Sequence, residues 1–145
     1  LQIKKYIILL YSISNIMYSK DIFKILIVAV LLVVVDYFYL TSISGYFNKQ
    51  IRAIQNAPIK LDMVATAVCY AFLVFGIYYF VIREKRSALD GFFLGAVIYM
   101  VYETTNKAIL KDWAWKTVAL DGVWGGILFA LVTFFSYKAF ALLKL

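Results

Sequence analysis

The chain has 145 residues, 65% of them hydrophobic, against roughly 45–50% in an ordinary soluble domain. A soluble domain of this size has too little interior to bury so much apolar surface, so a lipid bilayer is the expected environment. There is no histidine and only one cysteine. These counts exclude His-based catalytic triads, His metal ligands, an internal disulfide and Cys-ligated metal clusters.

The net charge is +7, and the basic residues lie mostly between long apolar runs. Membrane proteins that meet anionic lipid head groups have this distribution. A nucleic-acid-binding module would need a basic face on a folded soluble domain, and no stretch is long enough to build one. The expected partners are therefore the lipid bilayer and, as open alternatives, a second copy of the chain or other members of a membrane complex.

Residues 1–16 contain a short apolar run behind Lys4 and Lys5, and the first methionine is Met17. The run is too short to span a bilayer. Two interpretations remain open for this segment: an interfacial segment, or sequence upstream of a natural start at Met17. Residues 17–145 form the predicted single membrane domain.

Four long apolar segments follow, each about 21–23 residues in length, or roughly 31–35 Å as a helix, which matches the hydrocarbon thickness of a bilayer. They are residues 23–43, 61–82, 88–110 and 117–137. Backbone groups in lipid must be hydrogen-bonded within the chain, and four strands cannot close a barrel, so these segments are predicted helices. The expected fold is all-α: an integral membrane, antiparallel four-helix bundle.

The connection after the first span carries an amphipathic pattern. Phe47, Ile51 and Ile54 share one helical face, and polar residues occupy the rest of 45–56. This pattern predicts a short amphipathic helix on the membrane surface. Pro58 follows it and disfavours helix in the residue before it, so the helix should end there.

The basic residues also predict an orientation. Nine lie on the side of the termini and the 83–87 loop, against six on the other side. An excess of Lys and Arg marks the cytoplasmic side, so we expect both termini in the cytoplasm. Counted from Met17 the balance is seven to six, and the Arg83, Lys85 and Arg86 cluster then carries most of the inference.

Three carboxylates fall inside the predicted spans: Asp36, Glu103 and Asp121. An unpaired charge near the bilayer centre costs about 2.5–3.5 kcal/mol on insertion scales. Antiparallel threading places all three in one leaflet, about 7–10 Å below the surface that carries the amphipathic segment. We expect at least one of them to be protonated near neutral pH, unless Lys107 or a bound cation neutralises the group.

The neighbours of these carboxylates on their helices are polar or aromatic. Residues three and four apart share a helical face, which groups tyrosines and Asn106 with Glu103, and Trp124 with Asp121. The sequence therefore predicts a polar pocket open toward one head-group layer. Its candidate ligand-binding residues are Asp36, Tyr39, Tyr99, Tyr102, Glu103, Asn106, Lys107, Asp121 and Trp124.

Small residues on the third and fourth spans predict close helix packing, because glycine lets two backbones approach. The predicted packing residues are Gly91, Gly95, Gly122, Gly125 and Gly126. Cys69 is interpreted as a small packing residue. The three carboxylates could chelate a divalent ion, but no spacing motif points to one. The metal and any cofactor are left unknown, and no catalytic residue is assigned.

The third and fourth spans carry a combined motif. On the third span it comprises Tyr102, Glu103, Asn106 and Ala108; Trp113 follows, and the fourth span carries Asp121-Gly122-Val123-Trp124-Gly125. On the first span, Asp36 precedes an aromatic cluster. The chain resembles, over about residues 25–136, a family of small membrane proteins catalogued as domain of unknown function 2177. Glu103 and Tyr39 depart from the Asp and Trp expected there. The resemblance implies a four-helix membrane protein with no assigned activity.

Three functions stay open at this point. The first is a non-enzymatic membrane protein that binds or conducts a proton, a cation or a polar head group at the carboxylate cluster. The second is a structural component of a membrane complex or virion, whose polar residues only hold the helices together. The third is a lipid-modifying enzyme that uses the carboxylates. A water-accessible pocket favours the first or third, and a dry, fully paired cluster favours the second.

Overall fold

The computed structural model describes the backbone of residues 2–145 and the side chains of residues 19–145. The predicted upstream or interfacial segment 1–16 lies outside the described side chains. The described backbone is helical, which confirms the all-α class. Its elements are α1 (Gln2–Gln55), α2 (Met63–Ile77), a π-helical turn η1 (Tyr78–Ile82) that continues α2, α3 (Ala88–Ile109) and α4 (Trp115–Leu143).

Among the described residues, three helices are long and apolar enough to cross a membrane. They are the Ser19–Gln55 part of α1, the Met63–Ile82 stretch of α2 with η1, and α4. α3 is long enough, but Asp90, Glu103 and Lys107 make it less apolar. The membrane-spanning character predicted from the sequence is therefore supported for three helices, and the crossing of α3 stays a prediction.

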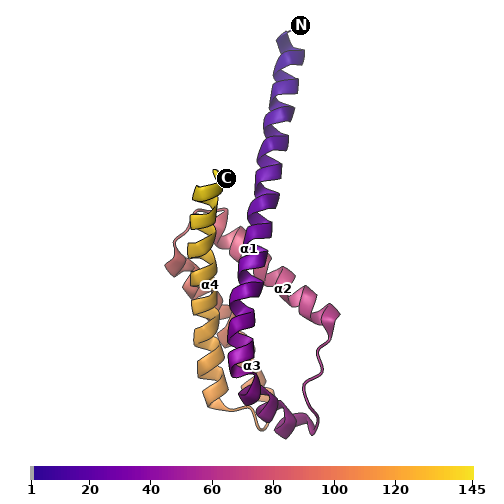
Figure 1. Cartoon of the computed structure of the whole chain (residues 1–145), viewed down its shortest axis with the longest axis vertical. Coiled ribbons are helices and arrows are strands. Elements are labelled where there is room, and N and C mark those ends of the chain that lie inside the picture. Colours follow the sequence, from indigo (N-terminus) through magenta and orange to yellow (C-terminus); the bar gives the residue numbers. More distant parts are fainter. Residues whose placement is uncertain (1) are drawn as a thin grey trace.

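The helices pack unequally. α3 and α4, joined by residues 110–114, make the most extensive contact; α1 packs along α4, and α2 has a smaller contact with α1. Figure 1 shows α1 and α4 side by side and α2 running at a steep angle to them. The regular four-helix bundle predicted from the sequence is thus not confirmed.

The amphipathic segment expected as a separate surface helix is instead the last part of α1, which runs to Gln55 without a break. Gly45 does not interrupt the helix, since an interior glycine costs only about 1 kcal/mol relative to alanine. Asn56 then turns the chain with a φ of 55°, and its N–H bonds to the carbonyl of Arg52. The predicted surface helix is therefore not confirmed, and the predicted end before Pro58 is confirmed.

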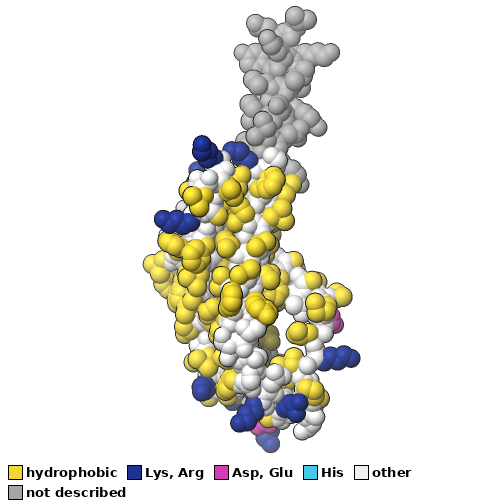
Figure 2. All heavy atoms as spheres, in the orientation of Figure 1, with side chains coloured by type: hydrophobic (Ala, Val, Ile, Leu, Met, Phe, Trp, Pro, Cys, Tyr) yellow, Lys and Arg dark blue, Asp and Glu magenta, His cyan; other side chains and the backbone are white. Residues whose placement is uncertain are grey.

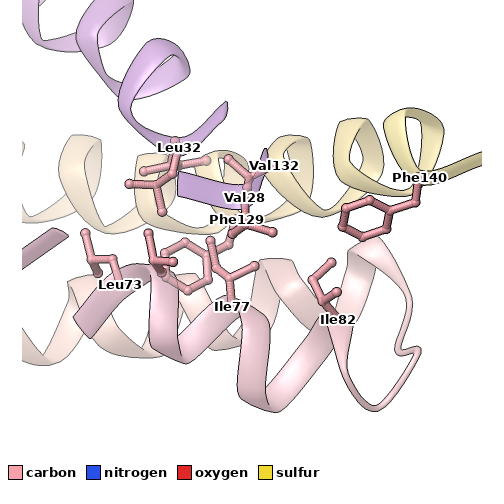
Figure 3. Close-up of a cluster of buried hydrophobic side chains, with 10 residues drawn as sticks. Val28, Leu32, Leu73, Ile77, Ile82, Phe129, Val132 and Phe140 are labelled. Atoms are coloured by element: carbon pink, nitrogen blue, oxygen red, sulfur yellow. The ribbon is translucent and has the colours of Figure 1, made fainter. Parts of the chain in front are cut away.

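The apolar core lies where α1, α2 and α4 meet. Val28 and Leu32 from α1 pack with Ile77 from α2 and with Phe129 and Val132 from α4 (Figure 3). Large apolar side chains are also exposed around the molecule, and in Figure 2 they cover the face between basic side chains that gather toward the two ends. This distribution suits a hydrocarbon layer with a head-group layer at each end.

The crossing of α3 can be tested by labelling single cysteines placed at Lys85 and Lys111 in a chain whose native Cys69, which is exposed, is replaced by alanine. If α3 crosses the bilayer, an impermeant thiol reagent reaches these two positions from opposite sides. A cysteine at Lys49 should then react from the same side as Lys111. Labelling of the Lys85 and Lys111 positions from one side would show that α3 does not cross.

Candidate functional site

Asp36 joins three helices. It is only 6% exposed. Its Oδ2 accepts a hydrogen bond from the Tyr70 hydroxyl at 2.6 Å, and its Oδ1 accepts one from Trp124 Nε1 at 2.9 Å. Tyr70 belongs to α2 and Trp124 to α4. Each carboxylate oxygen therefore has a donor, and the residue connects α1 to both neighbours.

Tyr39, one turn further along α1, connects Asp36 to Asp121. Its ring stacks on Trp124 with centroids 4.2 Å apart and planes 9° from parallel. Its hydroxyl donates to Asp121 Oδ1 at 3.0 Å. The aromatic stack thus fixes the position of two donors, one for each aspartate, since buried Tyr and Trp need partners for their polar ends.

Glu103 is fully buried at 0% exposure and is only half satisfied. Trp113 Nε1 donates to its Oε2 at 2.7 Å. Its Oε1 is buried and receives no N–H or O–H donor from the side chains and backbone that the structure describes. Asp121 lines the same cavity as Glu103, and the two carboxyl groups interact electrostatically.

Glu103 and Asp121 therefore form a carboxyl pair. Two carboxyl groups can share a hydrogen bond only when one of them carries a proton, because ionised carboxylates are acceptors alone. Two ionised carboxylates that line one buried site would repel each other, because the surrounding medium has a low dielectric constant. The arrangement can thus hold a shared proton, or it can bind a positive charge in place of that proton.

Glu103 and Asp121 help to line a cavity of about 690 Å³, a volume within the usual range of ligand sites, about 300–1,000 Å³. Asp121 keeps 9% of its surface exposed and lines this cavity, as does Glu103. The other lining residues come from the last part of α1, the segment before α2, and the α3–α4 region: Leu40, Ser44, Phe47, Asn48, Ile51, Gln55, Ile59, Lys60, Leu61, Tyr102 and Trp113.

The remaining predicted site residues lie around this network. Tyr102 lines the cavity, and the Tyr99 ring lies against Gly125. Asn106 has a buried Nδ2 with no partner among the described residues. The ammonium of Lys107 lies 5.9 Å from the centre of the Trp115 ring, and within residues 19–145 we find no ion pair between it and the three carboxylates.

A three-carboxylate metal site gains no support from the geometry. Within the described part of the chain, no three His, Cys, Asp or Glu side chains are grouped so that they could hold a metal ion. Asp36 already accepts one hydrogen bond on each oxygen, from Tyr70 and from Trp124.

Sequence reasoning missed two donors of the site, Tyr70 and Trp113. Trp113 entered the sequence analysis only as part of the motif of the third and fourth spans, and no residue of the second span was among the candidate ligand-binding residues. The sequence does contain one indication of these contacts. A buried Tyr hydroxyl or Trp indole N–H usually donates to an acceptor. A second missed cluster lies beside the site: the Tyr46 hydroxyl is 2.9 Å from Thr117 Oγ1, which also donates to Gln50.

The contact between α3 and α4 depends on glycine. A Cβ at Gly95 would overlap the backbone carbonyl of Gly125, and one at Gly125 would overlap the Tyr99 ring. A Cβ at Gly91 would lie 3.1 Å from the carbonyl oxygen of Phe129. The two helices that carry Glu103 and Asp121 are thereby held close together. The other predicted packing residues, Gly122 and Gly126, face Met100 and Phe92.

Comparison with known proteins gives one match. The family model described as "Predicted membrane protein (DUF2177)" matches residues 21–138. No curated protein and no solved structure matches the chain. The match includes α2, α3, the carboxyl pair and every described donor to the three carboxylates. The chain therefore belongs to this family of predicted membrane proteins.

Proposed function

We propose that this protein is a non-enzymatic, four-span membrane protein that binds a small positively charged group at the Glu103–Asp121 carboxyl pair. The observation that carries the proposal is the buried Oε1 of Glu103, which no described donor reaches. An unsatisfied buried acceptor is expensive, and native structures contain few of them. A cation beside the pair supplies the missing donor and removes the repulsion between the two carboxylates.

The contrast with Asp36 supports a binding role over a purely structural one. A carboxylate that only holds helices together is satisfied by the protein, and Asp36 accepts one donor on each oxygen. Glu103 has a donor on one oxygen only, and it lines a cavity. We therefore assign Asp36 to the framework and the Glu103–Asp121 pair to the ligand.

The second candidate is the structural function, in which the pair holds one proton permanently and no ligand. The electrostatic interaction between the carboxyl groups of Glu103 and Asp121 favours it, because one proton on the two groups removes their repulsion. In both cases the topology we propose has α3 crossing the bilayer and both termini on the cytoplasmic side. The basic cluster in the 83–87 loop supports this orientation.

The test is thermal unfolding of the full chain in detergent, with ethanolamine as the added cation. We expect the melting temperature of the wild type to rise with ethanolamine concentration, because a ligand that binds only the folded state stabilises it by mass action. The rise should be larger at pH 8 than at pH 5, since protons compete with the amine for the carboxyl pair. Asp121→Asn should fold and lose the response.

Asp112→Asn is the matched control. Asp112 is exposed, lies in the connection before α4 and does not line the cavity, so this variant makes the same change of charge at the same end of the molecule. It should respond as the wild type does. An equal response from Asp121→Asn, or no response from the wild type at either pH, would contradict the binding function and favour the structural one.

A further inference from the structure

We propose that the ligand of this site is a phospholipid with a primary-amine head group, its ammonium at the Glu103–Asp121 pair and its phosphate at Lys60. The inference rests on the proposed function and adds the chemical class of the ligand. Phosphatidylethanolamine is the simplest lipid with these two charges, and we take it as the occupant.

The lining of the cavity carries both signs of charge. The two acids come from α3 and α4, whereas Lys60 comes from the segment between α1 and α2. Lys60 is exposed and is the one basic residue among the side chains that line this cavity. A zwitterionic head group carries an ammonium and a phosphate, so one ligand can pair with the two acids and with Lys60.

The walls of the cavity favour a lipid over a soluble ion. Leu40, Phe47, Ile51, Ile59 and Leu61 line it, and a bare cation or a small soluble amine would leave this apolar surface uncovered. An acyl chain leaving the head group can cover it and gains free energy with each buried methylene group. The volume of about 690 Å³ also exceeds what a single small cation fills.

The carboxyl pair also selects the kind of ammonium. A primary ammonium has three N–H donors, enough for Asp121, which is 9% exposed, and for the donor that Glu103 Oε1 lacks. A trimethylammonium group has no N–H donor and is usually held by the faces of aromatic rings. Aromatic rings of Phe47, Tyr102 and Trp113 also line the cavity, so it is the missing N–H donor that disfavours a trimethylammonium group at Glu103 Oε1.

The experiment measures binding to the full chain in detergent by ligand-dependent thermal unfolding. The probes are short-chain phosphatidylethanolamine, phosphatidylcholine and phosphatidylglycerol, an alkylamine of similar chain length, and soluble phosphoethanolamine. Phosphatidylethanolamine should bind most tightly. The alkylamine should bind about tenfold more weakly, the loss expected for one charge-assisted hydrogen bond. The choline and glycerol lipids should give no specific shift.

Two variants locate the charges. Lys60→Gln should weaken the binding of phosphatidylethanolamine to the level of the alkylamine and leave the alkylamine unchanged. Lys49→Gln is the matched control: Lys49 is exposed near the same end of α1 and does not line the cavity, so both affinities should stay at the wild-type value.

Each contrary result has its own meaning. Equal binding of the alkylamine and phosphatidylethanolamine, with no effect of Lys60→Gln, overturns this inference and leaves the proposed cation site standing. Soluble phosphoethanolamine that binds as tightly as the lipid overturns the lipid as the occupant. Failure of every amine probe overturns the inference together with the proposed function.

Discussion

Replacement of Gly95 by alanine is expected to lower the free energy of unfolding by about 3 kcal/mol, the upper part of the range for overpacked sites. The added Cβ would overlap the carbonyl oxygen of Gly125 and lie 2.8 Å from its carbonyl carbon and from Phe129 Cβ. Backbone atoms cannot rotate out of the way, so α3 and α4 must move apart. Unfolding in mixed detergent micelles, followed by the helical circular dichroism signal, measures the loss.

Gly45→Ala provides a control of opposite sign. Gly45 also lies inside a helix, α1, but a Cβ there meets no atom within 4 Å. Alanine is a better helix former than glycine, so we expect a gain of about 0.5–1 kcal/mol. If Gly95→Ala is as stable as Gly45→Ala, the close approach of α3 and α4 described here is wrong.

Gly122→Ala adds an intermediate case. Its Cβ would meet the thioether end of Met100, with the sulfur at 2.5 Å. Methionine is flexible and can adopt another rotamer, so the cost should stay under about 1 kcal/mol. All three variants add the same methyl group. Together they therefore separate the cost of a contact with the backbone from the cost of a contact with a side chain.

Much of the fold was predictable because local rules decide it. The apolar lengths set the helices, Pro58 follows the end of α1, and Ser87 begins α3 through a capping box with Asp90. The continuity of α1 was not predictable from the amphipathic pattern alone. An exposed glycine such as Gly45 weakens a helix without ending it, and Gln50 on that stretch is buried beside Thr117, a contact that only the tertiary structure supplies.

The sequence predicts which acidic residues belong to the candidate site better than it predicts which of them contact each other. Charges inside apolar spans identify Asp36, Glu103 and Asp121, because lipid makes each of them costly. Which two form a pair depends on how the helices rotate and cross, and the sequence does not specify this. Lys107 shows the same limit: it shares a helical face with Glu103, yet its ammonium lies over Trp115, which begins α4.

Replacement of Asp36 by alanine should lower the free energy of unfolding by about 2–3 kcal/mol. The change removes the acceptor of two hydrogen bonds and leaves both donors without a partner. The Tyr70 hydroxyl and Trp124 Nε1 would then lie beside an apolar methyl group. Tyr70→Phe made on top of Asp36→Ala should cost little more, since its partner is already gone. A double-mutant cycle in detergent measures this coupling.

Asp36→Asn should cost less than about 1 kcal/mol, because asparagine keeps both contacts in altered form. Its carbonyl oxygen can accept from Trp124 Nε1, and its amide can donate to the Tyr70 hydroxyl oxygen, which accepts as readily as it donates. The hydrogen bonds of Asp36, rather than its charge, would then explain its place in the structure. A cost for asparagine equal to that for alanine would show that the negative charge is needed there, and the proposed cation site would then have to include Asp36 as well as Glu103 and Asp121.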